Sequence, residues 1–358
     1  MSKCTLFFSR CACAILLALL SSIFAQASEL DSVRTLNLDP NLVWDKISPS
    51  DYVLSKDGKT LVKWKNHSVS NLDMEREPRL SKVQFIGDGA FSSYSGSLET
   101  VVLASSVKSI GDGAFYDCRN LINVILPDSI TSIGASMFQG CNKIEQIIIP
   151  SSVKHIGNSA FRGCSGLKHL LIPTSVTSIG DWAFADCGGL IDCTIPPSVT
   201  TIGASAFADC RALTELIIPS SVTSIGEQAF FNCFSLISVV LPSSLTRIER
   251  ESFLGCYNLK SVVIPSSVVT IREQAFWGHK VLESVIIPSS VTSIGKDAFS
   301  SSFSDVLLNL RFESPKSPYV DDFIASEYSK IKIIVPKGAR ESYIKANLVA
   351  NAECIVEE

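Results

Sequence analysis

The stretch IPSSVTSIGEQAFFNC, Ile218–Cys233, decides how this chain folds, because it is one of a series of near-copies. The stretch IPTSVTSIGDWAFADC, Ile172–Cys187, is the copy two periods earlier. Ten phenylalanines keep this register, the first two 24 residues apart and the others 23 apart: Phe91, Phe115, Phe138, Phe161, Phe184, Phe207, Phe230, Phe253, Phe276 and Phe299. A fixed period in the twenties predicts a solenoid with one strand in each turn.

Within one repeat, the residue types predict which side chains point into the core. Leu216 and Ile218 alternate with Ile217, which indicates a short strand with one buried face. Pro219 ends that strand, because proline has no N–H group for the ladder. The return segment and a short helical turn are expected to point further apolar residues inward: Val222, Ile225, Ala229, Phe230 and Cys233.

A single unit of this kind cannot bury its apolar face alone, so neighbouring units must stack. The sequence therefore predicts a right-handed coil of about ten 23-residue repeats. One parallel β-sheet should line the concave face, with short helical turns opposite. The predicted solenoid covers residues 81–312, where the period holds. Residues 28–80 and 313–358 break the period and are predicted to be the N-terminal and C-terminal caps.

The first 27 residues have the pattern of a signal peptide. Lys3 and Arg10 are basic, residues 11–24 are apolar, and Ala25-Gln26-Ala27 fits a cleavage site. An uncleaved anchor is the alternative interpretation. The pattern predicts export, and the expected location is secreted or at the cell surface, with no transmembrane segment after cleavage.

The composition limits the class of protein. The chain has 358 residues, of which 46% are hydrophobic and 18% charged, so it is too apolar for a disordered protein. Its formal net charge is −4. A nucleic-acid-binding protein needs a basic surface, so nucleic acid is excluded as the expected partner.

The repeat also resembles a known family. Leu213-x-x-Leu216-x-Ile218 matches the leucine-rich-repeat pattern, and the IPxSVTSIGxxAFxxC continuation resembles the BspA-like class of these repeats. The stretches Tyr52–Trp64 and Ile333–Asn347 resemble the segments that flank the repeats in Bacteroidetes members. The resemblance implies an exported or surface protein, since some members are regarded as adhesins for host matrix proteins or other cells.

Cysteines form a column three residues after the phenylalanines. The column contains Cys118, Cys141, Cys164, Cys187, Cys210, Cys233 and Cys256, and His279 and Ser302 follow in the next two repeats. No C-x-x-C pair suggests a metal site, and no catalytic residue, metal ligand or cofactor site is predicted. Disulfides between stacked turns are the alternative. Parallel side-chain directions and an odd number favour buried free thiols that fill the core.

Two further columns predict structure rather than catalysis. A serine lies two residues after each of eight prolines, and eight copies indicate turn hydrogen bonds instead of a nucleophile. A glycine follows the TSI motif, as in Gly226, but Glu249 and Arg272 replace it in two repeats. We therefore expect a backbone conformation there that is not restricted to glycine, and a surface ion pair between Glu249 and Arg272.

The first candidate binding surface is the residue two before each proline, expected to face out from the sheet. Seven of the eight are apolar: Ile125, Ile148, Leu171, Ile217, Val240, Val263 and Ile286. Thr194 is the eighth. An exposed apolar stripe is typical of a binding surface. The alternative is that branched residues occur there only because they suit β-strands.

The second candidate patch is aromatic and lies on the other side of the coil. It consists of Phe231, Phe234, Leu254, Tyr257 and Trp277. Aromatic side chains dominate interface hot spots. The alternative, slightly favoured by the sequence, is that these residues cover the core locally or contact the C-terminal tail.

The sequence therefore predicts a non-enzymatic, exported leucine-rich-repeat protein that binds a protein, in an adhesin-like manner, through the solenoid surface. A host matrix protein, another cell surface or a glycan is the expected partner. The alternatives are a structural or self-assembling surface component, a glycan-binding accessory protein, or an enzyme on a solenoid scaffold. No cluster of acids and histidine breaks the repeat to favour the enzyme.

Overall fold

The computed structural model describes residues 38–92, 97–301, 306–325 and 330–358. The predicted signal peptide, residues 1–27, and Ser302 lie outside these ranges. The chain divides into two compact units, Met1–Val43 and Trp44–Glu358. All strands and helices described below belong to the second unit.

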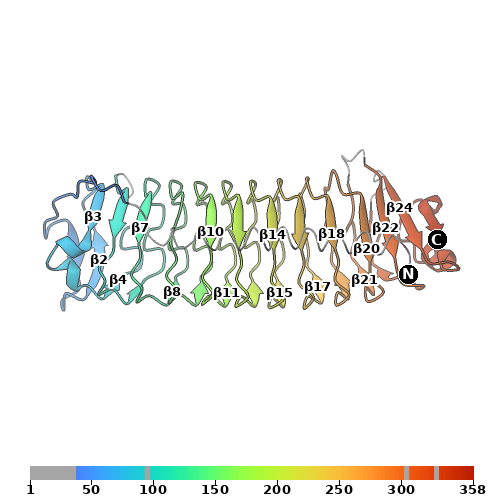
Figure 1. Cartoon of the computed structure of the whole chain (residues 1–358), viewed down its shortest axis with the longest axis horizontal. Coiled ribbons are helices and arrows are strands. Elements are labelled where there is room, and N and C mark those ends of the chain that lie inside the picture. The colour runs from blue at the N-terminus through green and yellow to red at the C-terminus, as the bar shows by residue number, and fades with distance from the viewer. Residues whose placement is uncertain (1–37, 93–96, 302–305, 326–329) are drawn as a thin grey trace. The chain divides into compact units, whose positions relative to one another are not determined.

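Residues Trp44–Glu358 form a parallel β-solenoid of about 12 turns with a repeat of about 23 residues. Most turns contribute a longer strand to one row and a two-residue strand to a second row, and Figure 1 shows the two rows running along the coil. The turn that contains Ile148 has no strand in the first row. The sequence predicted only the first row. The second row arises where the TSI motif runs alongside the TSI motif of the neighbouring turn.

The first row, the long-strand row, begins in the N-terminal region and continues to the end of the chain. It consists of β3 (Asn71–Asp73), β5 (Thr100–Val102), β7 (Asn123–Ile125), β10 (His169–Leu171), β12 (Asp192–Thr194), β14 (Glu215–Ile217), β16 (Ser238–Val240), β18 (Ser261–Val263), β20 (Ser284–Ile287), β22 (Leu308–Phe312), β24 (Ile331–Val335) and β25 (Ile355–Glu357). The outward surface of this row is called the strand face below.

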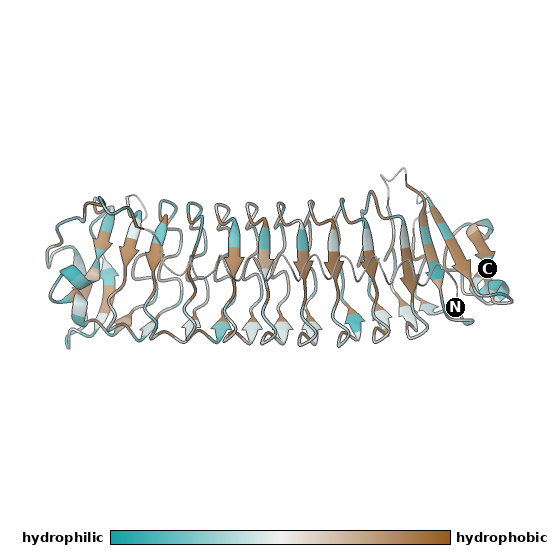
Figure 2. Cartoon of the chain, viewed as in Figure 1, coloured by the Kyte–Doolittle hydropathy of each residue, from teal (hydrophilic) through white to brown (hydrophobic). Residues whose placement is uncertain are grey.

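The second row, the short-strand row, consists of β2 (Thr60–Trp64), β4 (Phe85–Ile86), β6 (Ser109–Ile110), β8 (Ser132–Ile133), β9 (His155–Ile156), β11 (Ser178–Ile179), β13 (Thr201–Ile202), β15 (Ser224–Ile225), β17 (Arg247–Ile248), β19 (Thr270–Ile271), β21 (Ser293–Ile294) and β23 (Tyr319–Val320). Figure 2 shows that these strands are mostly white to teal, whereas the long strands carry more brown, hydrophobic positions. The outward surface of this row is called the short-strand face.

Neighbouring turns are in register one repeat apart. In the long-strand row Leu216 is paired with Val239, and in the short-strand row Ile202 is paired with Ile225. Leu216 and Ile218 are buried while Ile217 is half-buried, as the alternation predicted. Like residues therefore stack on like residues, which is why the sequence repeats.

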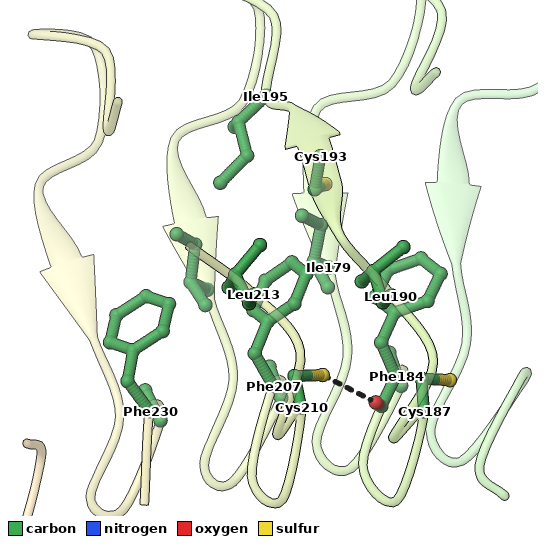
Figure 3. Close-up of a cluster of buried hydrophobic side chains, with 14 of the residues drawn as sticks. Ile179, Phe184, Cys187, Leu190, Cys193, Ile195, Phe207, Cys210, Leu213 and Phe230 are labelled. Atoms are coloured by element: carbon green, nitrogen blue, oxygen red, sulfur yellow. Dashed lines mark hydrogen bonds between the residues drawn. The ribbon is translucent and has the colours of Figure 1, made fainter. Parts of the chain in front are cut away.

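A continuous column of stacked phenylalanine rings fills the core. From Phe91 to Phe299 the ring centroids of neighbours lie 4.8 to 5.7 Å apart. The rings of Phe184, Phe207 and Phe230 lie side by side in Figure 3. At the N-terminal end Trp64 extends the column, 5.8 Å from Phe91, and Tyr52 follows 6.3 Å from Trp64.

The segment after each turn glycine is a hydrogen-bonded turn instead of the expected short helical turn. Its backbone amides donate to the following turn, as in Phe207 N–H to Ala229 O at 2.8 Å. Two residues after the glycine, the backbone is left-handed, as in Ser205 (φ 52°) and Gln228 (φ 57°). A left-handed residue interrupts a helix, so the inter-turn bonds replace helical ones.

Seven of the eight repeated serines bond between turns, and Ser290 Oγ alone has no partner among the described residues. In Ser198 and Ser221 the hydroxyl donates to the Val176 and Val199 carbonyls of the preceding turn, at 2.6 and 2.7 Å. The predicted ion pair is also present, because Arg272 Nε lies 3.2 Å from a Glu249 carboxylate oxygen. Both predictions are confirmed.

The ladders continue on both sides of residues 81–312. At the N-terminal end β1 (Tyr52–Leu54) pairs antiparallel with β2, and β2 pairs parallel with β4. At the C-terminal end β22, β24 and β25 extend the long-strand row. The helices lie at the two ends of the described chain: the 3-10 helices η1 (Met74–Arg76), η2 (Leu80–Lys82) and η3 (Ala352–Cys354), and α2 (Arg340–Lys345).

Candidate interaction surface

The apolar residues predicted to line the strand face differ in how far they are exposed. Ile125, Ile148 and Ile217 are half-buried. Leu171, Val240, Val263 and Ile286 are exposed, and Val263 is the most accessible at 69% of its surface. The accessible apolar surface is therefore concentrated in the C-terminal half of the stripe, on β16, β18 and β20.

The polar residues beside the stripe divide it into two zones. In the N-terminal zone His169 Nδ1 lies 2.7 Å from Asp192 Oδ2, and Lys168 Nζ lies 3.3 Å from Glu145. In the C-terminal zone the first residue of each strand is a serine: Ser238, Ser261 and Ser284. Short, uncharged side chains lie beside Val240 and Val263, whereas Leu171, which is also 43% exposed, has the longer polar side chain of His169 beside it.

Three further exposed residues, Ile122, Ile191 and Ile237, lie five residues before a proline and belong with this surface. Ile237 directly precedes β16 and is 39% exposed. The sequence prediction missed it because it considered only the residue two before each proline, while Ile237 lies five before Pro242. We call Ile237, Val240, Val263 and Ile286 together the apolar patch.

The aromatic patch is brought together only in part. The Phe234 and Tyr257 rings stack with centroids 5.0 Å apart and an interplanar angle of 2°. Arg211 lies over Phe234 at 5.5 Å and Lys280 over Tyr257 at 4.3 Å, measured to the ring centroids. Phe231, Leu254 and Trp277 are half-buried at equivalent positions of successive turns. Stacked rings with a cation at each end already have partners, which agrees with local covering.

The cysteine column is buried and holds free thiols, as the sequence predicted. Each thiol donates to the phenylalanine carbonyl of the preceding turn, as in Cys210 Sγ to Phe184 O at 3.2 Å (Figure 3). Burial raises the pKa of Cys187 and of Cys256 to about 12. The cysteines of the column are therefore unreactive side chains that fill the core, and none is a candidate nucleophile.

Thiol labelling checks this. Residues 28–358 contain nine cysteines: Cys118, Cys141, Cys164, Cys187, Cys193, Cys210, Cys233, Cys256 and Cys354. In unreduced native protein we expect a thiol reagent to label Cys354 at most, because the other thiols are inaccessible and protonated. After denaturation without reductant all nine should react. Few reactive thiols in the denatured protein would instead show disulfides between turns.

His279 takes the cysteine position after Cys256 and is buried. Its Nε2 lies 3.0 Å from Phe299 O, so Nε2 carries the proton and donates, while Nδ1 has no hydrogen-bond partner in the described residues. Burial lowers the pKa of His279 below its ordinary value of 6.5. Protonation would place a second N–H group in an apolar site.

This arrangement predicts a pH dependence of stability. The unfolded chain binds the proton more readily than the folded chain, so the free energy of unfolding should fall as pH drops below 6.5 towards the folded pKa. The control variant His279→Cys has at this position the cysteine that seven earlier turns have. The measurement is a series of denaturant titrations between about pH 7.5 and 5, the range in which an ordinary histidine titrates. Over this range the variant should lose less stability than wild type. Equal losses would contradict the assignment.

No group of three or more His, Cys, Asp or Glu side chains within the described ranges is arranged to hold a metal ion. Within the same ranges, no helix is long and apolar enough to cross a lipid bilayer.

Comparisons with known proteins agree with this geometry. The family model for the BspA type leucine rich repeat region matches residues 84–214 and 183–305 in six copies. Among solved structures, a leucine-rich repeat protein from Bacteroides ovatus is 22% identical, with 90% of each chain covered and a TM-score of 0.63. The pneumococcal vaccine antigen PcpA is 18% identical, with 86% of this chain and 82% of that chain covered and a TM-score of 0.50.

No curated protein matches the chain. The two solved structures share the fold at low sequence identity, and the family model spans more than half of the chain. This chain belongs to the BspA-type leucine-rich-repeat family.

Proposed function

We propose that this protein is exported and binds a partner protein, in an adhesin-like manner, through the strand face. The observation that carries the proposal is the apolar patch, in which Val263 is 69% exposed and Val240 and Ile286 are its neighbours in the parallel row. Contiguous exposed aliphatic groups are a feature of protein-binding surfaces. The N-terminal pattern of a signal peptide and the membership of the family support export.

The surroundings of the apolar patch favour a protein partner. An interface centre is commonly apolar and depleted of charge, with polar residues at its rim. Here Ser238 and Ser261 lie beside the valines, and the charged residues Lys260 and Glu283 are exposed next to the strands. The backbone of β18 is paired on both sides, so its side chains provide the contact surface.

The end of the long-strand row is protected against pairing with another copy, which favours a binder over a self-assembling component. β25 is the terminal strand of its sheet. The Ile355 carbonyl accepts a hydrogen bond from Arg340 Nε at 2.9 Å, and Glu357 places a charge on the same strand. Charged side chains on an edge strand oppose strand addition. Light scattering of the purified protein should therefore show a monomer.

The experiment replaces two neighbouring residues of the apolar patch with opposite charges. Val240→Lys with Val263→Glu should abolish binding to a panel of immobilised matrix proteins or to intact cells, because charge would be desolvated in an apolar contact. The free energy of unfolding should change by no more than about 0.5 kcal/mol, as for other surface substitutions. Binding is measured by surface plasmon resonance and stability by denaturant titration.

Two further variants test the location of the binding surface. Val269→Glu is a matched control, since Val269 is 43% exposed but precedes β19 of the short-strand row. It should bind like wild type. Phe231→Ala with Trp277→Ala tests the aromatic patch. Loss of binding in that variant, with normal binding in the strand-face variant, would move the site to the aromatic patch and refute the assignment.

A further inference from the structure

A second feature lies on the short-strand face, away from the apolar patch. An open groove with a volume of about 600 Å³ runs across the turns that contain β9, β11, β13 and β15. Its floor includes four successive turn glycines, Gly157, Gly180, Gly203 and Gly226. The groove therefore follows the axis of the coil over four repeats.

The floor is bare backbone, and at these glycines the neighbouring turns approach one another closely. A Cβ atom on Gly203 would lie 2.5 Å from the Asp181 backbone nitrogen, and one on Gly226 would lie 2.4 Å from that of Ala204. In the next two repeats Glu249 and Arg272 occupy this position and form their ion pair. Side chains thus replace the bare floor at the C-terminal end of the groove.

The walls of the groove carry hydrogen-bonding groups of both kinds. One wall has the outward side chains of the short strands, which include His155, Ser178 and Thr201, and the other has Asn158 and Asp181. His155 Nδ1 lies 2.9 Å from Ser178 Oγ. The Thr201 hydroxyl has no hydrogen-bond partner among the residues that the structure describes.

In each of the two side chains of the second wall, one polar atom is hydrogen-bonded within the protein and the other is not. Asn158 Oδ1 accepts from the Asp181 N–H group at 3.0 Å, and Asp181 Oδ1 accepts from the Ala204 N–H group at 2.7 Å. The Asn158 amide nitrogen and Asp181 Oδ2 make no hydrogen bond to any described residue. These bonds hold both side chains in place, while the remaining donor and acceptor can bind a ligand.

The lining excludes two classes of ligand. It contains the Asp181 carboxylate and no lysine or arginine, so an anionic ligand would be repelled. The strands β11 and β13 are paired on both sides, so a peptide cannot add as a further strand there. A neutral ligand rich in hydroxyl groups matches the donors and acceptors, since a hydroxyl group can both donate and accept.

An exposed aromatic ring follows the groove wall in the chain. Trp182 comes directly after Asp181 and is 38% exposed, with the Arg162 guanidinium 4.8 Å from its ring centroid. The equivalent residues in the adjacent turns are Ser159 and Ser205, so the fold does not require an aromatic side chain there. Because Arg162 lies over this ring and Trp182 does not line the groove, we do not assign Trp182 a contact with the ligand.

We propose that this groove binds a neutral, extended oligosaccharide. The hydroxyl-bearing wall and the Asn158–Asp181 wall hydrogen-bond sugar hydroxyls. The groove extends over four turns, so a linear chain of several sugars fits it better than a monosaccharide. This site is separate from the strand face and does not depend on the function proposed for it.

The test uses an array of neutral hexasaccharides (cello-, manno-, xylo- and maltohexaose) with hexagalacturonate as the anionic probe. The purified protein should retain at least one neutral hexasaccharide and should not retain hexagalacturonate. Thr201→Arg should weaken retention more than about tenfold, because the side chain fills the groove and removes a hydrogen-bonding group. Asp181→Asn should weaken it about tenfold, whereas Trp182→Ser, outside the groove lining, should bind like wild type.

Each variant uses a residue that the fold already has in the same column, which protects the test from misfolding. Arg247 is equivalent to Thr201, Asn158 to Asp181, and Ser205 to Trp182. The matched control Ser109→Arg changes an exposed short-strand residue outside the groove and should bind normally. The proposal is overturned if wild type retains no neutral hexasaccharide, if only hexagalacturonate binds, or if Thr201→Arg binds as tightly as wild type.

Discussion

Replacing Phe184 with alanine should lower the free energy of unfolding by about 3–5 kcal/mol, as expected for truncation of a fully buried aromatic side chain. Phe184 is completely buried, with the Phe161 ring 5.3 Å away on one side and the Phe207 ring 5.2 Å away on the other. Both neighbours are held by their own turns, so the cavity cannot collapse. Denaturant titration followed by circular dichroism measures the loss.

The control for this prediction is Phe231→Ala, one phenylalanine outside the stacked column. Phe231 is half-buried, so its truncation removes less apolar area from the folded state and should cost clearly less stability. Because each turn contacts only its neighbours, hydrogen exchange should also show the Phe184→Ala effect to be greatest in the two adjacent turns. A denaturation midpoint equal to that of wild type would show that the column does not hold the coil together.

Much of this fold could be predicted from the sequence, because each turn repeats the same local pattern. The period indicated a solenoid, the alternation around Ile217 assigned the buried side of the strand, and the register brought Glu249 beside Arg272. These predictions succeed because they depend on spacing within one chain segment and on stacking of identical units.

The second row of strands could not be predicted in the same way. Strands of two residues, such as Ile225 with Ser224, have no alternation long enough to recognise, and their pairing depends on the neighbouring turn. The glycine column was also a weak guide to the backbone. The left-handed residue lies two positions later, at Ser205 or Gln228, and Gly226 is needed only because the backbones approach closely.

The ends of the coil were beyond sequence prediction for a related reason. Trp64 and Tyr52 continue the phenylalanine column although their spacing does not follow the 23-residue period. β24 and β25 extend the long-strand row after the period has ended. Insertions change the spacing while the stacking geometry stays the same, and only coordinates reveal this.

The sequence predicted the candidate binding residues as a uniform stripe, whereas in the structure they differ in how far they are exposed. Val263 is far more accessible than Ile125, although the two have equivalent positions in the repeat. The first residue of the strand also changes, from His169 and Asp192 to Ser238 and Ser261, although Leu171 beside His169 is itself 43% exposed. That change crosses turns and is not visible in any single repeat.

The adjacent residues Leu216 and Ile217 provide the sharpest test of which side of a long strand faces the core. Leu216 is 2% exposed and stacks in register with Val239, while Ile217 is half-buried at the strand face. Leu216→Glu should cost about 3–5 kcal/mol or more, because it leaves an unpaired carboxylate in an apolar core. Ile217→Glu should remain folded, because water can still solvate its carboxylate.

The two variants differ by one position and carry the same new side chain, so β-propensity and added charge are matched between them. Circular dichroism and size-exclusion chromatography at neutral pH should show an unfolded or aggregated Leu216→Glu protein and a native Ile217→Glu protein. For Leu216→Glu, lowering the pH should restore part of the lost stability, since protonation removes the buried charge. If Ile217→Glu were the more damaging substitution, Ile217 would face the core, and both the assigned register and the apolar patch on the strand face would be wrong.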